Sequence, residues 1–208
     1  MKKISVTVVI VLLSLARGTS TGAQQTPTPG GAGSAFNPNG TIASQLNQQL
    51  SFVEEEVVGA AKAMPEDKYS FVPANGEFKG VRNFAQQVMH IATANYLLYG
   101  AIVPDDPTAA AKRQAAPSAQ TKDQILQYLQ DSFAFAHKAI GTIDAENMLQ
   151  PVKRPPNPFA STNLELAVFG CSHGTDIYGQ MVEYLRMNGI VPPFTANRPG
   201  RGTSQPAR

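Results

Sequence analysis

Apolar residues recur at intervals of three or four along four stretches of the chain, which is the period of an amphipathic α-helix. These stretches cover about residues 41–64, 81–102, 121–143 and 163–187. In the first of them the apolar positions are Ile42, Leu46, Leu50, Val53 and Val57. No stretch shows the alternation of period two that is typical of half-buried strands. The pattern therefore predicts four long helices and no sheet.

Start and stop signals agree with these helices. Pro65 and Pro104 follow the first two, and the fourth opens with the capping-box pattern of Thr162 and Glu165. Because each helix has an apolar stripe to bury, we expect an all-α four-helix bundle. The connections at 65–80 and 145–161 are long and rich in proline. We expect them to form ordered caps over the ends of the bundle.

The two ends of the chain differ in composition from the helical region. Residues 1–23 combine Lys2 and Lys3, an apolar run and small residues at 21–23, which is typical of a secretory signal peptide. Residues 24–40 and 197–208 are rich in Pro, Gly, Ser and Thr, so we expect a flexible leader and a disordered tail. The domain itself should cover 41–196, and the protein should be exported to the periplasm or the extracellular space.

Charge excludes one class of partner. Lys2, Lys3 and Arg17 are three of the 17 basic residues, so removal of the signal leaves 14 basic against 15 acidic side chains. A nearly neutral domain without a basic stripe is not expected to bind nucleic acid. No run after the signal is long enough to span a membrane, so no membrane span is expected either.

Few residues can carry chemistry. The chain has three histidines and a single cysteine, Cys171, but no glycine-rich phosphate loop, G-x-S-x-G or CxxC motif. Cys171 is best interpreted as a small buried hydrophobe, and no histidine shares its helical face to act as a base. Metal chemistry remains as the candidate, because neutral imidazole is the commonest metal ligand in proteins.

Three strings then carry a resemblance to a known family. They are MPEDKY at 64–69, QQVMHIATAN at 86–95 and HGTDIYGQMVEYLRMNGIVPP at 173–193. Together they resemble the DinB/YfiT family across nearly the whole domain, most specifically in the last string. The resemblance implies a four-helix bundle with one divalent metal, Zn or Ni. The metal would be held by one histidine of the second helix and a His-x-x-x-His pair of the last.

Transferred to this chain, the resemblance assigns two of the three ligands. His90 matches the ligand of the second helix and His173 the first ligand of the last helix, but Ile177 occupies the third position. Isoleucine cannot coordinate a metal, so the site is predicted to be degenerate. Asp176 is an alternative ligand at i, i+3 from His173, although it lies about 60° to the side, in a stripe that we interpret as solvated. If the ancestors had three histidines, His90, His173 and Ile177 should converge on one cavity.

The remaining polar residues have simpler interpretations. His137 has no counterpart in the family's ligand set and is expected at the surface or its boundary. Glu54, Glu55 and Glu56 are expected to form a solvated face, of which one carboxylate could turn inward. The last helix also has apolar residues opposite His173, which need cover from a neighbouring helix or a homodimer. These residues are Leu164, Val168, Cys171, Tyr178 and Val182.

Two functions remain open at this stage. Members of the family include thiol-cofactor S-transferases and isomerases, together with many proteins called hydrolases, so the chain could be a metal-dependent enzyme. The missing ligand weakens this interpretation, and the alternative is a non-catalytic binding or scaffold protein of the cell envelope without bound metal. Neither interpretation identifies a small-molecule ligand, a catalytic residue or a reaction.

Overall fold

The four long helices each begin at a residue whose side chain caps the first turn. The caps are Thr41, Asn83, Thr121 and Thr162, and each accepts a hydrogen bond from a backbone N–H three residues later. At the last three caps, the side chain of the residue at that third position bonds back to the cap, which completes a capping box. Local side-chain chemistry therefore sets these helix starts.

The computed structural model describes residues 40–114, 121–153 and 160–197. Its long helices are α1 (Ile42–Ala63), α2 (Phe84–Gly100), α4 (Lys122–Ile140) and α5 (Asn163–Met187). Shorter elements are the 3-10 helix η1 (Glu66–Lys68), α3 (Thr108–Gln114) and α6 (Pro193–Ala196). The described residues contain no strand, only an isolated bridge between Pro151 and Thr162. The all-α prediction is confirmed, whereas the predictions for 1–39 and 198–208 lie outside the described residues.

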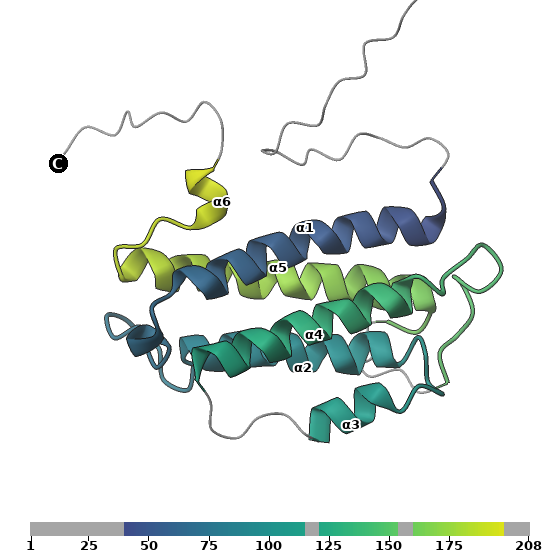
Figure 1. Ribbon diagram of the computed structural model, residues 1–208, viewed down its shortest axis with the longest axis horizontal. Helices are drawn as coiled ribbons and strands as arrows, with labels where there is room; N and C mark the ends of the chain where they lie inside the picture. The colour runs from purple at the N-terminus through teal and green to yellow at the C-terminus, as the bar shows by residue number, and fades with distance from the viewer. Residues whose placement is uncertain (1–39, 115–120, 154–159, 198–208) are drawn as a thin grey trace, which may run out of the picture. The chain divides into compact units, whose positions relative to one another are not determined.

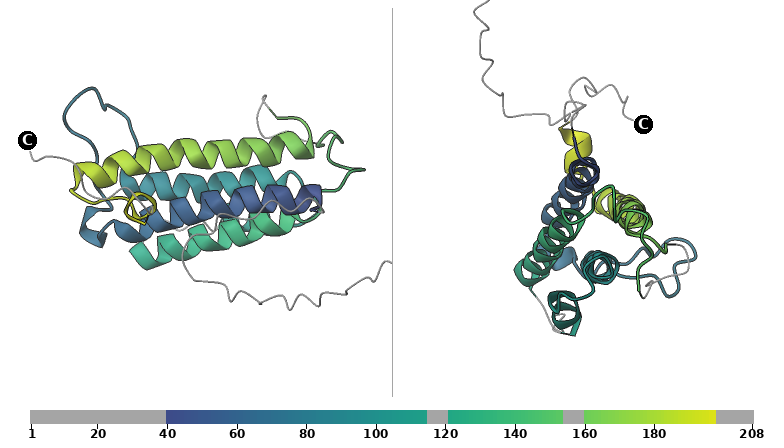
Figure 2. Two further views of the ribbon diagram at one scale, coloured as in Figure 1. Left: turned by 90° about the horizontal axis from the view of Figure 1, so that it is seen from above. Right: turned by 90° about the vertical axis from the view of Figure 1, so that its right-hand side faces the viewer.

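The long helices form a bundle in which each has two neighbours. Helix α2 packs between α4 and α5, and α1 packs between the same two on the other side. Figure 1 shows the helices side by side, and the end-on view of Figure 2 shows α3 lying outside α2 and α4. This arrangement makes α2 and α5, which carry His90 and His173, direct neighbours.

The predicted apolar stripes face the core. In the second stretch, apolar residues spaced three, four or seven apart are all buried: Phe84, Val88, Ile91, Leu98 and Ile102. Among the three glutamates of α1, Glu56 is the one that turns inward, with 7% of its surface exposed. The opposite face of α5 is covered only in part, since Cys171 is buried but Val168 remains 53% exposed. Neighbouring helices therefore cover only part of this face, because α1 and α2 contact the other sides of α5, and cover of the rest by a homodimer stays a prediction.

Helix α3 was not predicted from the sequence. Its seven residues, TAAAKRQ, contain only alanines as apolar residues and so carry no stripe. Tertiary contacts hold it: Lys112 forms an ion pair of 3.0 Å with Asp131 of α4, and Tyr128 donates a hydrogen bond to the Lys112 carbonyl. In turn, α2 and α4 are shorter than predicted, ending at Gly100 and Ile140 where hydrogen-bonded turns follow.

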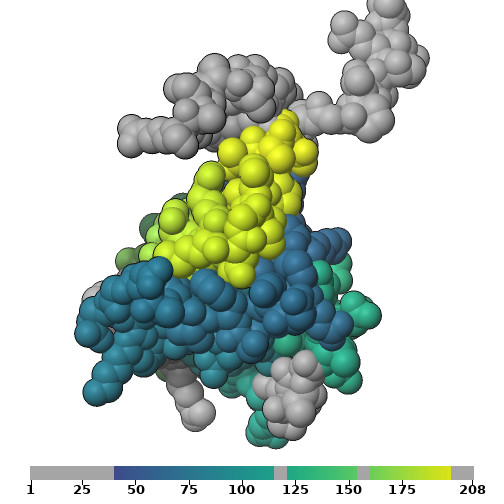
Figure 3. Space-filling model, turned by 90° about the vertical axis from the view of Figure 1, so that its left-hand side faces the viewer, coloured from purple at the N-terminus to yellow at the C-terminus, as the bar shows by residue number. Residues whose placement is uncertain are grey.

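The connection between α1 and α2 is ordered, as predicted. Tyr69 is 6% exposed, and its hydroxyl donates to the carbonyl of Ala61 at 2.8 Å. The backbone of this connection also holds the start of α2, since the N–H of Phe84 donates to the carbonyl of Phe71. Figure 3 shows this connection in blue beside the yellow end of α5. It therefore forms one end of the bundle and places Arg82 beside α2.

No helix in the described ranges is long and apolar enough to cross a membrane.

Candidate functional site

His90 of α2 and His173 of α5 meet across the interface of these two helices. Their Nε2 atoms are 3.1 Å apart, and the two half-buried rings stand nearly perpendicular, with 83° between their planes. The ring of Phe169, one turn earlier on α5, stacks parallel to His173 with 6.1 Å between centroids. The predicted approach of the two imidazoles is thus present in the structure.

Two glycines allow α5 to come close enough for this contact. A Cβ atom on Gly174 would lie 2.6 Å from Cγ1 of Val53 on α1. A Cβ atom on Gly170 would collide with the Tyr99 hydroxyl on α2. Because His173 lies between these two glycines in the sequence, the close packing of α5 on both neighbours sets the position of its ring.

The surroundings of both imidazoles favour the neutral form. Burial lowers the pKa of His90, and the charges of Arg82 and His173 lower it further. Burial also lowers the pKa of His173, with Asp176 acting in the opposite direction and Arg82 in the same one. A neutral imidazole has a free lone pair on one nitrogen, which is the form that coordinates metals.

The geometry of the pair fits two ligands of one metal ion. Two nitrogens about 2.0–2.1 Å from a shared ion, at an angle between about 90° and 109°, lie roughly 2.8–3.4 Å apart. The observed 3.1 Å falls within this interval. Two of the three positions that the resemblance assigns as ligands therefore hold nitrogens whose separation suits a shared divalent cation.

The third position does not fit. Ile177 is 3% exposed and lies one turn after His173 on α5. Asp176 is exposed, as expected, and its carboxylate accepts a hydrogen bond of 3.4 Å from the Gln180 amide. Across the described part of the chain, no group of three or more His, Cys, Asp or Glu side chains could hold a metal. A cation at the pair would therefore have only two protein ligands of these kinds.

A polar chain that the sequence did not reveal continues from Asp176. Because a carboxylate only accepts, it orients the Gln180 amide so that Gln180 Oε1 accepts from Gln87 Nε2 at 2.8 Å. Gln87 is 2% exposed, and its own Oε1 has no donor among the described residues. Since Gln87 lies three residues before His90 on α2, this buried acceptor is one helical turn from the pair. The sequence could not identify Gln87, because a glutamine at an exposed helix position looks the same. Its hydrogen bond to Gln180 across the two helices identifies it.

The third histidine lies elsewhere in the bundle. His137 of α4 is half-buried, as expected at a boundary, and it joins α4 to α1. Its Nδ1 lies 2.7 Å from Oδ1 of Asn47, and its Nε2 lies 3.0 Å from Oε2 of Glu54. Both ring nitrogens are therefore occupied, which gives this residue a structural role that the sequence did not indicate.

Cys171 is buried, as the sequence predicted. Its Sγ lies 3.9 Å from the Tyr99 hydroxyl, and burial raises the pKa of the thiol. A protonated, buried thiol without a histidine beside it is a poor nucleophile. Covalent catalysis through this cysteine therefore finds no support in the structure.

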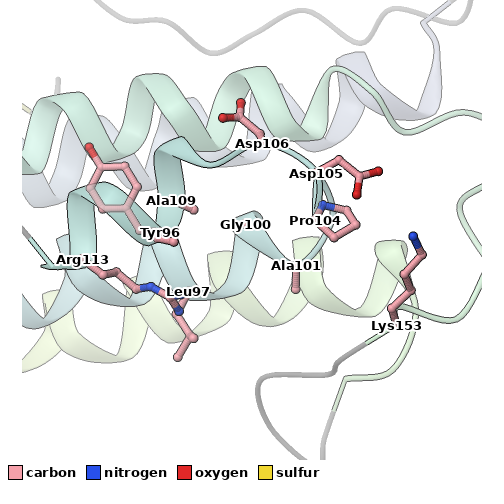
Figure 4. Close-up of a pocket in the computed structure, with 11 residues that line it drawn as sticks. Tyr96, Leu97, Gly100, Ala101, Pro104, Asp105, Asp106, Ala109, Arg113 and Lys153 are labelled. Carbon is pink, nitrogen blue, oxygen red and sulfur yellow. The ribbon is translucent and has the colours of Figure 1, made fainter.

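Two surface hollows flank α2, and only one of them includes a histidine. The hollow beside the pair has a volume of about 540 Å³. Its lining residues are Gly80, Val81, Arg82, Gln86, Met89, His90 and Thr93. A larger hollow of about 610 Å³ lies between α2 and α3, and its lining includes the charged residues Asp105, Arg113 and Lys153 (Figure 4). The larger hollow is therefore separate from the histidine pair.

A comparison with models of protein families finds a match. The model of the DinB superfamily matches residues 49–181, a range that includes His90, His173 and Ile177. No curated protein matches the chain.

Proposed function

Because the chain belongs to the DinB superfamily, we propose that it is an exported protein whose His90 and His173 bind one divalent cation, Zn or Ni. The observation that carries the proposal is the separation of 3.1 Å between the two Nε2 atoms, which suits two ligands of a shared ion. The low pKa of both imidazoles also supports it, since coordination needs the neutral ring. Export rests on the composition of residues 1–23.

Two protein ligands leave most of the coordination sphere to molecules from solution. A divalent cation in such an open site supplies Lewis-acid chemistry to whatever occupies the open positions. The chain's own residues contribute position: Gly170 and Gly174 let α5 approach its neighbours, and Phe169 stacks on the His173 ring. The proposed function is therefore binding of a small ligand at an incompletely coordinated metal.

The test is a titration of the purified full chain with Zn²⁺ and Ni²⁺ by calorimetry in chelator-free buffer near neutral pH. We expect one equivalent of metal in the wild type, and a loss of at least about tenfold in affinity in both His90→Ala and His173→Ala, since each removes a ligand. The matched control is His137→Ala, because both nitrogens of His137 are already bonded to Asn47 and Glu54. Equal affinity in all four proteins would overturn the proposal.

One observation favours a second function, that of a non-catalytic envelope binding or scaffold protein without metal. At 3.1 Å, two neutral imidazoles also satisfy one another through an N–H···N hydrogen bond, in which one ring donates and the other accepts. Burial of Ile177 fits a site that has changed from coordination to packing. In this case the wild type takes up no metal, and His173→Ala lowers stability without changing metal content.

A further inference from the structure

The larger hollow, between α2 and α3, has side chains of both charges that lack partners. Among its charged lining residues, Asp106 is already committed, because its carboxylate caps the start of α3 and pairs with Lys138 at 3.5 Å. Asp105, Arg113 and Lys153 form no ion pair with any residue that the structure describes. The hollow therefore offers one carboxylate and two cationic groups to a molecule from solution.

The free carboxylate and the free guanidinium stand well apart. Asp105 precedes α3 and Arg113 lies in its last turn, and Figure 4 shows them at opposite ends of this helix. Seven helical residues rise about 10 Å, so a free amino acid, which carries both charges on one carbon, is too short to reach both. An extended dipeptide spans about 7 Å between its termini, and an ion pair at each end covers the rest. The spacing thus suits a ligand of the length of a dipeptide.

The wall between these charges is apolar. Leu97 leaves 39% of its surface exposed there, although α2 and α3 approach closely, since a Cβ on Gly100 would lie 2.6 Å from Cβ of Ala109. Further small lining residues are Ala101, Pro104 and Ala110. Small side chains leave room for an apolar group that would remove Leu97 from water. The volume of about 610 Å³ is in the range of small-molecule sites.

One buried polar group of the lining also lacks a partner. Tyr96 is 1% exposed, and its hydroxyl forms no hydrogen bond with the described residues. Buried hydroxyls of native proteins nearly always have a partner. A ligand with peptide N–H and C=O groups can supply one, directly or through a bridging water. This second observation favours a peptide over an occupant that is charged only at its ends.

We propose that the hollow between α2 and α3 binds a zwitterionic dipeptide with an apolar side chain. Its carboxylate pairs with the Arg113 guanidinium, whose planar fork of donors matches two oxygens, and its ammonium pairs with Asp105. The apolar side chain covers Leu97, and the exposed ammonium of Lys153 donates to the peptide carbonyl. This site needs no metal and lies apart from the histidine pair, so the inference goes beyond the proposed function.

The experiment compares three related peptides by calorimetry on the full chain. The probes are alanyl-leucine, its N-acetylated form without the ammonium, and its C-terminal amide without the carboxylate. Each is titrated into the wild type, Asp105→Asn and Arg113→Gln. The matched controls are Asp67→Asn and Arg186→Gln, which remove the same charges from exposed residues outside the hollow. Circular dichroism checks that each variant is folded.

We expect the wild type and both controls to bind alanyl-leucine at least about tenfold more tightly than either modified peptide. Asp105→Asn should bind the free and acetylated peptides equally, while it still discriminates against the amide. Arg113→Gln should bind the free and amidated peptides equally, while it still discriminates against the acetylated one. No binding of alanyl-leucine by the wild type, or binding that neither substitution weakens, would overturn the inference. Preference of the wild type for the acetylated peptide would also overturn it, because the occupant would then be an anion held by Arg113 and Lys153.

Discussion

His137 and the pair of His90 and His173 each lie half-buried between two helices, but their ring nitrogens meet different neighbours. Both nitrogens of His137 face oxygen atoms, of Asn47 at 2.7 Å and Glu54 at 3.0 Å. The Nε2 atoms of the pair face one another instead, and His90 lines an open hollow.

The difference shows why burial and residue type alone do not identify a candidate metal site. The neighbours of His137 use its hydrogen-bonding capacity within the protein, so the residue links α4 to α1. In the pair, the two Nε2 atoms face one another at 3.1 Å. Among the described contacts of these two atoms, no oxygen acceptor fixes which ring nitrogen carries the proton. Coordination thus depends on convergence of nitrogen atoms, which only the packing of two helices produces.

Among the variants that distinguish the histidine pair from His137, Gly174→Ala should have the largest effect. The added Cβ would lie 2.6 Å from Cγ1 of the fully buried Val53 and so push α5 away from α1. We expect a loss of about 1–3 kcal/mol in the free energy of unfolding, measured with urea. In NMR spectra, the imidazole signals of His90 and His173 should shift, whereas those of His137 should not.

Gly179→Ala is the matched control on the same helix. No atom lies within 4 Å of a Cβ at this position, so alanine should raise stability by up to about 1 kcal/mol through its higher helix propensity. If the two variants have equal stability, close packing at Gly174 does not position the pair.

The next effect concerns the position where the pair lacks a third ligand. Ile177→His would place a second imidazole at i, i+4 from His173 on a buried face of α5. We expect Zn²⁺ or Ni²⁺ to bind at least about tenfold more tightly than in the wild type, a gain of at least about 1.4 kcal/mol, measured by calorimetry. Ile177→Leu keeps the burial without a ligand atom and should bind as the wild type does. No gain in Ile177→His would contradict descent from a three-histidine site.

The smallest effect is expected at the histidine that links α1 and α4. His137→Ala removes two hydrogen bonds from a partly exposed position, so the free energy of unfolding should fall by about 1 kcal/mol while metal affinity stays unchanged. Lys138→Ala is the adjacent control, because the ion pair with Asp106 is 3.5 Å long and the lysine is 77% exposed. A drop in metal affinity in His137→Ala would remove the distinction between the two regions.

Much of the fold could be predicted because its signals are local. The start of α5 at Asn163 follows from Thr162 and Glu165, whose hydrogen bonds join residues only three positions apart. In contrast, α3 carries no stripe and exists through contacts with α4, such as that between Lys112 and Asp131. The exposure of Val168 was also unpredictable, because a stripe does not indicate whether a neighbour covers it.

The sequence by itself determined the four long helices, the two histidines that could bind one metal ion, and the isoleucine at the third ligand position that the resemblance implies. Only the tertiary structure decided that α2 and α5 are neighbours, that His137 belongs to another interface, and that Tyr184 of α5 bonds to the backbone of Arg82. The physical reason is the distance along the chain over which each interaction acts. Caps and stripes act within one or two helical turns, whereas Tyr184 and Arg82 are 102 residues apart and meet only when the whole core is packed.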